Sequence, residues 1–368
     1  MTITVGFVGT GLIARIHLKG LLALHQLHIV DIDIIAVHDT DESRAAAFAA
    51  QCSAEGHHTV VVDSAAQVAQ RCDAVWVCTP TAHHREAVEV AAANGCAIFG
   101  EKPLAISRQD CEAMVEAVER SGVIAQVGLV LRYAPEFIAL ADRLVDSQKH
   151  GHGRVMTVQF RDDQYLPNQG MYASTWRADV SLAGGGTLIE HSIHDLDALA
   201  WFCGPIQSIS ANMSCFAENP GIEDLAVLKL RHTSGVVSTL TSVWHQVLTR
   251  GSLRRIEAFC EHAVITFDDR VPQTIEIERS VGTEALRVES PVAHADQLPT
   301  AIELGDGHRQ YALEDLAFLQ SVRDGVAAAP GFRVALAAHA AADAAYRSAS
   351  AHGAWVDVVE WAGASPAV

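Results

Sequence analysis

Residues Val5–Arg15 read Val-Gly-Phe-Val-Gly-Thr-Gly-Leu-Ile-Ala-Arg, and the architecture of the first part of the chain follows from them. The apolar run at residues 3–8 predicts a β-strand, and the residues after the glycines open a helix. Gly9 is expected to make the tight turn, and Gly11 to let the backbone approach a bound pyrophosphate. Ala14 is small enough for the helix to pack on the strand. A strand, a glycine turn and a helix in this order are typical of a dinucleotide-binding fingerprint.

Further along the chain, predicted strands alternate with predicted helices of about ten residues. The strands are expected at residues 33–38, 60–62, 74–77, 97–99 and 124–129. This alternation predicts an α/β, Rossmann-type domain with a doubly wound parallel sheet over residues 1–128. Ligands bind at the carboxyl ends of such strands. Four residues that suit a cofactor lie there: Gly9, Asp39, Thr79 and Lys102.

The pattern changes near residue 130. Helices are expected from Pro135 to Asp146, as one helix over 187–202, and at 311–324 and 334–349. Strand-like segments are expected at 154–162, 206–216, 224–232, 235–245 and 253–267, whereas 268–307 is hard to assign. Consecutive strands with short turns predict an α+β domain with a mainly antiparallel open sheet over residues 129–368. The helix at about 334–349 is expected to pack back on the rest.

Composition limits the function further. A length of 368 residues suits two domains, and 49% hydrophobic residues can form a large core. The net charge of −18 argues against a nucleic-acid or anionic-membrane partner. The eight cysteines form no Cys-x-x-Cys pair, as expected of reduced thiols in a cytoplasmic protein. The first strand begins too early to leave room for a signal peptide, and no apolar run is long enough to span a membrane.

Two segments carry side chains suited to proton transfer. Lys102 ends a strand at the ligand-binding edge, where a partly desolvated lysine beside a nicotinamide can gain or lose a proton. Glu190 and His194 are one turn apart on the predicted helix, and such a pair can transfer protons near neutral pH. Glu190 could instead cap the helix, or it could bind zinc together with His191 and His194. Because no further ligand completes such a shell, we expect no metal.

The chain resembles the Gfo/Idh/MocA oxidoreductases, a family named for glucose–fructose oxidoreductase, inositol dehydrogenase and a rhizopine-catabolism protein. The matching segments cover nearly the whole chain, and the Glu-Lys-Pro triplet together with Gly-Gly-Gly…His-x-x-Asp is specific. They are Gly9–Ala14, Cys78–Pro80 with His84, Glu101–Pro103, Arg132 with Pro135, Trp176–Arg177, Gly184–Gly186, Glu190–Asp197 and Ala341–Ser348.

The resemblance implies Lys102 and His194 as the catalytic acid/base pair, with Glu190 beside them. It also implies homodimers or homotetramers formed through the open sheet. The implied cofactor contacts are Gly9, Thr10, Gly11, Leu12, Ile13, Asp39, Thr79, Pro80, His84, Glu101 and Lys102. The expected substrate contacts are Arg132, Tyr165, Trp176, Arg177, Glu190 and His194. Many sugar and inositol members carry Asp where this chain has Glu190, which leaves the substrate open.

We therefore expect an NAD-dependent oxidoreductase acting on a secondary hydroxyl of a sugar, a sugar derivative or an inositol. A second hypothesis is a redox-neutral glycoside hydrolase, which oxidises a glycoside, eliminates the aglycone and reduces the product again with the same NAD. A third hypothesis is a non-catalytic dinucleotide sensor. NAD is expected rather than NADP because the Asp39 carboxylate accepts from ribose hydroxyls but repels a 2′-phosphate. Arg44, one turn further on, softens that bias, and Asp39 or Asp41 also suits the start of the next helix.

Overall fold

The computed structural model describes residues 2–271, 273–289, 291 and 308–361. Its elements fall into two compact units, and each is described by itself. Unit 1 comprises Met1–Ile106, Ala113–Ala134 and Ser290–Ala335, and unit 2 comprises Ser107–Glu112, Pro135–Glu289 and Leu336–Val368.

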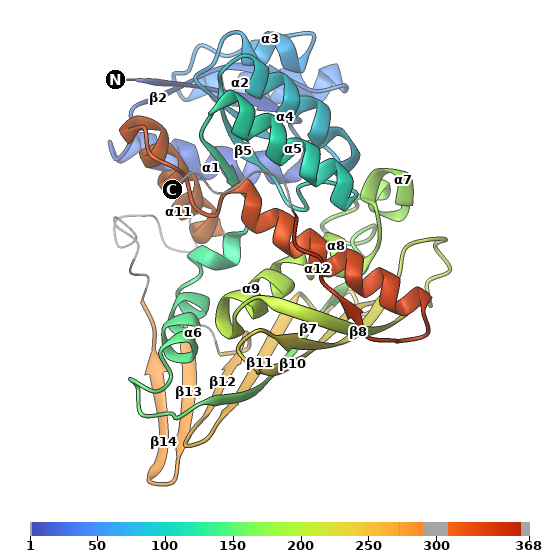
Figure 1. Ribbon diagram of the computed structural model, residues 1–368. Helices are drawn as coiled ribbons and strands as arrows, with labels where there is room; N and C mark the ends of the chain where they lie inside the picture. The colour runs from blue at the N-terminus through green and yellow to red at the C-terminus, as the bar shows by residue number, and fades with distance from the viewer. Residues whose placement is uncertain (1, 272, 290, 292–307, 362–368) are drawn as a thin grey trace. The chain divides into compact units, whose positions relative to one another are not determined.

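Unit 1 is built on a six-stranded sheet whose strands are all parallel, in the order β3-β2-β1-β4-β5-β6 (Figure 1). The strands are β1 (Ile3–Val8), β2 (Ile32–His38), β3 (Val60–Val61), β4 (Ala74–Val77), β5 (Ala97–Gly100) and β6 (Ala125–Val127). The helices between them are α1 (Leu12–Gln26), α2 (Glu42–Ala54), α3 (Ala65–Ala69), η1 (Thr81–His83), α4 (His84–Ala93) and α5 (Arg108–Ser121). Every residue of β4 and β5 is buried, as in a parallel sheet covered on both faces. The expected Rossmann-type domain is confirmed.

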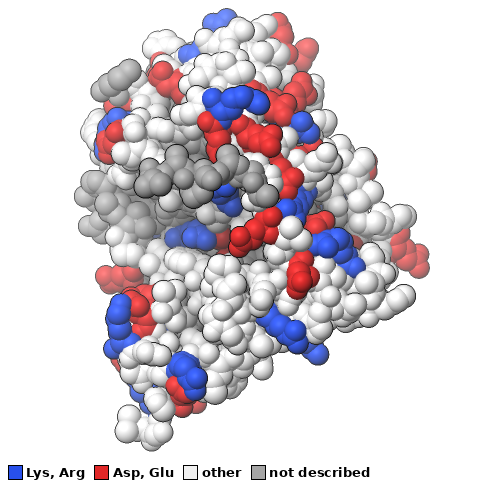
Figure 2. Space-filling model, viewed as in Figure 1, with Lys and Arg blue, Asp and Glu red and all other residues white. Residues whose placement is uncertain are grey.

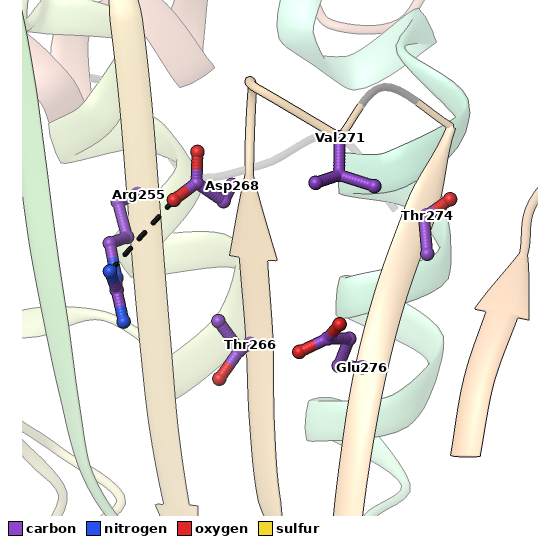
Figure 3. A pocket seen from close by; sticks show the side chains of 6 residues that line it. All are labelled: Arg255, Thr266, Asp268, Val271, Thr274 and Glu276. Atoms are coloured by element: carbon purple, nitrogen blue, oxygen red, sulfur yellow. Dashed lines mark ion pairs between the residues drawn. The ribbon is translucent and has the colours of Figure 1, made fainter. Parts of the chain in front are cut away.

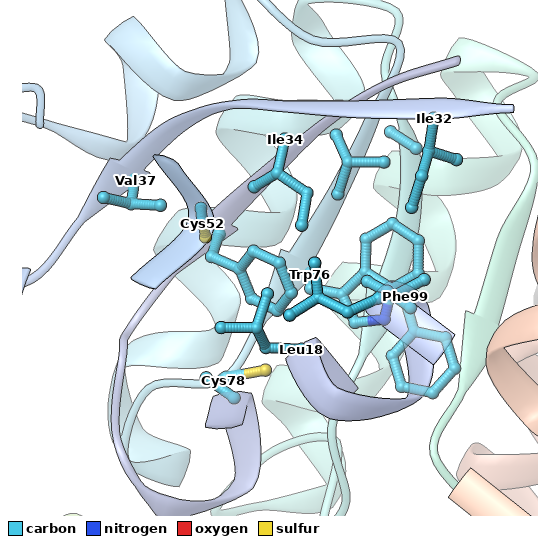
Figure 4. Close-up of a cluster of buried hydrophobic side chains, with 14 of the residues drawn as sticks. Leu18, Ile32, Ile34, Val37, Cys52, Trp76, Cys78 and Phe99 are labelled. Carbon is cyan, nitrogen blue, oxygen red and sulfur yellow. The ribbon is translucent and has the colours of Figure 1, made fainter. Parts of the chain in front are cut away.

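Aromatic rings fill the centre of unit 1 (Figure 4). Trp76 of β4 stacks between Phe7 of β1 and Phe99 of β5, with ring centroids 5.8 and 5.7 Å apart. Phe318 of α11 (His308–Asp324) meets Trp76 edge-on at 5.2 Å. The domain boundary expected at residue 128 would place α11 in the second domain. In the structure α11 belongs to unit 1, because its apolar face packs against α1.

Unit 2 contains a nine-stranded sheet in the order β14-β13-β12-β11-β7-β10-β9-β8-β15. The strands are β7 (Val155–Tyr165), β8 (Ile206–Ser214), β9 (Leu225–His232), β10 (Val237–His245), β11 (Leu253–Cys260), β12 (Val264–Asp268), β13 (Thr274–Arg279), β14 (Gly282–Arg287) and β15 (Val356–Asp357). Among these described strands, β10 and β7 run parallel and every other neighbouring pair runs antiparallel. The prediction of a mainly antiparallel sheet is therefore confirmed.

Two details of unit 2 differ from expectation. The segment 253–267 is a hairpin rather than one strand, because the backbone turns after Cys260 and its N–H donates to the Ala263 oxygen at 2.8 Å. Strands β13 and β14 lie within 268–307, where the sequence pattern predicts no element, while residues 292–307 lie outside the described residues.

Three helices pack on strands of this sheet. Helix α6 (Pro135–Val145) contacts β13, α8 (Thr187–Glu190) contacts β9 and β10, and α9 (Ile193–Cys203) contacts β7. The other helices of this part of the chain are η2 (Val130–Tyr133, in unit 1), η3 (Thr175–Ala178), α7 (Val180–Ala183) and α12 (Phe332–Ser350). Phe137 of α6 contacts Phe202 of α9 and Phe267 of β12, with centroids 6.0 and 5.5 Å apart. On β9, buried and exposed residues alternate strictly, so the opposite face of the strand is open. Within the described ranges, no helix has both the length and the apolarity to cross a membrane.

Candidate functional site

The glycine turn has the geometry that a dinucleotide needs. Gly9 has φ +88°, and a Cβ there would lie 2.7 Å from the backbone of Cys78, so only glycine fits. Gly11 caps α1 without a side chain, which leaves the first N–H groups of the helix to a ligand. A Cβ at Gly11 would meet nothing within 4 Å, so the space beside it is open to that ligand. These residues fit a dinucleotide pyrophosphate.

Asp39, just past β2, is tied to this turn. Its Oδ2 accepts hydrogen bonds from the Thr10 backbone N–H at 2.8 Å and from Thr10 Oγ1 at 2.9 Å. Its Oδ1 accepts from the Asp41 N–H at 2.9 Å, while Asp41 itself caps α2. Asp39 therefore shapes the glycine turn, and Asp41 is the one of the two candidates that caps α2. Arg44 lies 3.7 Å from Asp39 and 3.1 Å from Asp41.

His84 is one of the expected cofactor contacts, and it is buried inside unit 1. Its Nε2 lies 2.8 Å from the Thr79 oxygen and its Nδ1 lies 3.1 Å from the Leu104 oxygen. Through these bonds His84 links the loop after β4, with Thr79 and Pro80, to the loop after β5. His84 therefore supports these loops, and its contact with the cofactor stays a prediction.

Lys102 lies at the carboxyl end of β5 and is half-buried. Its backbone N–H donates to Glu101 Oε2 at 3.0 Å. Burial alone would raise the pKa of Glu101. Hydrogen bonding to His17 and the charges of His17 and Lys102 outweigh burial and hold that pKa below its usual value. Glu101 is thus an anion next to the lysine backbone.

Behind Glu101 lies a buried charged network that the sequence analysis missed. His17 Nε2 is 2.9 Å from Glu101 Oε1, and His17 Nδ1 is 2.8 Å from Asp315 Oδ1. The Trp76 indole donates to the same Asp315 oxygen at 2.9 Å. Helical spacing is the sequence signal that points to these two residues. His17 lies on the apolar face of α1 with Ala14, and Asp315 interrupts the apolar face of α11.

Among the described residues, one set of three side chains comes close enough to bind a metal ion, and it lies in this network. Donor atoms of His17, Glu101 and Glu314 all lie within 4.8 Å of one another. Burial raises the pKa of the Glu314 carboxyl well above its usual range, against the opposing charge of His17. Both nitrogens of His17 already face carboxylates, so we interpret the cluster as a hydrogen-bonded network.

In unit 2 the prediction of one helix over 187–202 is wrong. Helix α8 ends at Glu190 and α9 begins at Ile193. Ser192 at the break hydrogen-bonds Ser242 of β10 at 2.6 Å, and it lies 3.4 Å from Asp162 of β7. These contacts with strands distant in sequence interrupt the helix. The one-turn spacing that placed Glu190 beside His194 therefore does not apply.

Glu190 contacts Arg177. Arg177 Nε lies 2.9 Å from Glu190 Oε2, and the guanidinium stacks on the Trp176 ring at 4.4 Å. Glu190 is 2% exposed and His194 is 5% exposed. The ring of the buried Tyr165, another expected substrate contact, packs 5.5 Å from Tyr172. All of these residues belong to unit 2, whereas Lys102 and the half-buried Arg132 belong to unit 1.

A second buried cluster lies next to the break between α8 and α9. Arg254 of β11 is bonded to Asp162 at 3.0 Å and to Asp195 at 2.9 Å, and His191 lies 2.9 Å from Asp162. Burial, and then the neighbouring Asp162, raise the pKa of Asp195 to about 7. His191 thus pairs with Asp162, and the zinc set of Glu190, His191 and His194 does not assemble among the described residues.

A small pocket of about 180 Å³ lies on the sheet of unit 2, across β11, β12 and β13 (Figure 3). Arg255 and Asp268 form an ion pair at 3.9 Å in its wall. Thr266 and Glu276 face each other across the neighbouring strands. None of the expected site residues lines this pocket.

Comparisons with known proteins agree with this architecture. Residues 3–129 match the model of an oxidoreductase family with an NAD-binding Rossmann fold, and residues 138–266 match the Gfo/Idh/MocA C-terminal domain. The chain belongs to the Gfo/Idh/MocA oxidoreductase family. Its first domain is an NAD-binding Rossmann domain, as the resemblance implied.

Several relatives are similar over much of the chain. An inositol 2-dehydrogenase of Rhizobium meliloti (strain 1021) is 27% identical over 364 residues, which is 95% of this chain and 97% of the relative. The scyllo-inositol 2-dehydrogenase (NAD(+)) of Bacillus subtilis (strain 168) is 34% identical over 44% of this chain and 46% of its own length. A levoglucosan dehydrogenase, solved with NADH and levoglucosan, has a TM-score of 0.84 at 21% identity and covers 98% of this chain and 100% of its own. That likeness shows the fold.

Proposed function

We propose that the chain is an NAD-dependent dehydrogenase that oxidises a secondary hydroxyl of a sugar, a sugar derivative or an inositol. The observation that carries the proposal is Lys102, a half-buried lysine just past the carboxyl end of β5 in the NAD-binding unit. The similarity to an inositol 2-dehydrogenase over nearly the whole chain supports the substrate class.

The reaction removes a hydride from the carbinol carbon and a proton from its hydroxyl, which leaves a ketone. When bound, NAD supplies the hydride acceptor. The residues of the chain supply the base: Lys102 or His194, in its neutral form, takes the hydroxyl proton. Arg177, held by Glu190 and stacked on Trp176, offers its remaining N–H groups to substrate oxygens.

The direct experiment is a screen of sugars, inositols and glycosides with NAD, followed at the NADH absorption band. Formation of NADH with a polyol supports the proposal. Release of an aglycone from a glycoside without net NADH identifies the redox-neutral glycosidase instead. If no compound reduces bound NAD or releases an aglycone, the sensor interpretation gains support and the proposal fails.

We further propose a homodimer or homotetramer formed through the open face of the unit 2 sheet. Val227 of β9 and Val237 of β10 are 40% and 42% exposed on neighbouring strands. On the face shown in Figure 2, acidic and basic side chains are interspersed.

We propose small polyols as the ligands of the chain. We also propose the cytoplasm as its compartment, because the cysteines are free thiols and seven of the eight are buried.

A further inference from the structure

Helix α1 links the glycine turn to the buried charged network. Its first residues follow Gly11, where the pyrophosphate is expected, and two turns later it carries His17. His17 is fully buried, and both ring nitrogens face carboxylate oxygens at 2.8 and 2.9 Å. Asp315 and Glu101 raise the pKa of His17 well above its ordinary value although burial opposes them. The ring is therefore an imidazolium that donates from both nitrogens.

Glu101 bridges this imidazolium to Lys102. One carboxylate oxygen, Oε1, accepts from His17, and the other, Oε2, accepts from the Lys102 backbone N–H at 3.0 Å. Gly128 lies against the carboxylate, because a Cβ there would be 2.7 Å from Oε1. The Glu101 side chain is thus confined, and the backbone of Lys102 is bonded to it.

The other end of the chain of bonds is also fixed. Asp315 accepts from His17 and from the Trp76 indole, and Trp76 is completely buried between Phe7 and Phe99. Hydrogen bonds therefore run from β4, through α11 and α1, to the residue at the end of β5. The bonds of His17 to Glu101 and Asp315, and that of Trp76 to Asp315, are buried and charge-assisted, and such bonds make this part of the network rigid.

We propose that His17 is a positioning residue that acts through Glu101 to fix the backbone of Lys102 at the carboxyl end of β5. This inference rests on the proposed function, because it gives Lys102 the catalytic proton transfer. Removing the imidazole releases Glu101, and the lysine backbone loses its fixed acceptor. A shift of the reacting group by about 1 Å can lower a rate by about 100-fold.

The experiment measures four variants of the full-length protein with its best substrate. For His17→Ala we expect kcat to fall about 10- to 100-fold, with a larger primary deuterium isotope effect and little change in NAD binding. His17→Gln can still donate to Glu101, so we expect it to recover part of the lost kcat. Lys102→Met reports on the proposed function. His57→Gln is the matched control, because His57 is a buried histidine of unit 1 that contacts Asp33 at 3.3 Å, outside this network.

A second readout does not depend on activity. Amide hydrogen exchange of the peptide that contains Lys102 should accelerate in His17→Ala and stay unchanged in His57→Gln, because the Lys102 N–H donates to Glu101. If His17→Ala does not fold, Asp315→Asn tests the same chain of bonds with both readouts.

The outcomes separate the inference from the function. Wild-type kcat, isotope effect and exchange in a folded His17→Ala protein, together with an impaired Lys102→Met, overturn the positioning role alone. If Lys102→Met is as active as the wild type, Lys102 does not take the hydroxyl proton and this inference fails, while the dehydrogenase activity itself stands. If the wild type reduces NAD with none of the compounds screened, the proposed function fails. A loss of thermal stability in His17→Ala without any change in kcat or in Lys102 exchange also overturns the inference.

Discussion

At the scale of single residues, the Asp39 carboxylate has a structural role in the glycine turn and an expected role in binding the ribose. It accepts two hydrogen bonds from Thr10 in the cofactor turn, and it lies where a ribose hydroxyl is expected. The sequence predicted the second task from the position after β2. The first depends on a contact between residues 29 positions apart, which spacing within one segment does not reveal.

The first prediction concerns Asp39→Ser. We expect kcat/KM for NAD to fall more than kcat/KM for NADP rises, because the substitution loosens Thr10 as well as removing the charge that repels a 2′-phosphate. The preference for NAD should narrow. Steady-state kinetics with both cofactors checks this, with Asp343→Asn on the surface as control. A wild type that uses NADP as efficiently as NAD would contradict it.

At the scale of elements, the sequence predicted the strand–turn–helix of the cofactor site because each part is encoded locally. It placed β1, α1 and the end of β5 correctly for the same reason. It missed the break between α8 and α9, since Ser192 is held by Ser242 and Asp162 from two strands. It also missed His17, because one polar residue on an apolar helix face does not reveal its partners.

The second prediction uses the cluster that anchors α9. The pKa of Asp195 is raised from its usual value to about 7, so the folded protein keeps a proton that the unfolded chain releases above about pH 4. Its contribution to the free energy of unfolding is therefore largest below about pH 4 and is lost as the pH rises to about 7. Asp195→Asn should remove this component. Urea unfolding between pH 4.5 and 8 should show a weaker fall in stability with rising pH than in the wild type.

The control for that measurement is again Asp343→Asn, which lies on α12 outside the cluster. It should reproduce the wild-type slope. Equal slopes for Asp195→Asn and the wild type would show that the Asp195 carboxyl does not titrate in this range.

At the scale of the whole molecule, the third prediction concerns assembly. Val227→Glu places a charge on the open sheet face, so we expect light scattering to show dissociation toward the monomer with NAD binding retained. Val281→Glu is the matched control, because Val281 is 95% exposed at the turn between β13 and β14. A monomeric wild type, or an intact oligomer in Val227→Glu, would refute this interface.

The fourth prediction concerns metal. The hydride transfer proposed here uses residues of the chain as acid and base, so we expect full activity after treatment with EDTA and dialysis. The assay is NADH formation before and after chelation. Loss of activity that zinc or another divalent cation restores would contradict this, and variants of Glu314 and His194 would then locate the ion.

The fifth prediction compares His194 with Glu190. His194→Ala should lower kcat about 10²- to 10⁴-fold if the imidazole transfers the proton. Glu190→Gln should lower kcat less and raise the KM of the substrate more, because Gln still accepts from Arg177 but loses the charge that holds it. Melting curves separate these effects from unfolding. A folded His194→Ala protein with unchanged kcat would remove His194 from the chemistry.

The central claim is that Lys102 takes the proton of the substrate hydroxyl, and Lys102→Met tests this claim most directly. Methionine keeps much of the length of the side chain and removes the amine, while the contacts of the cofactor turn and Asp39 remain. Steady-state kinetics combined with a titration of NAD should show kcat lowered about 10²- to 10⁴-fold and the affinity for NAD nearly unchanged. A folded Lys102→Met protein that turns over at close to the wild-type rate would contradict the account.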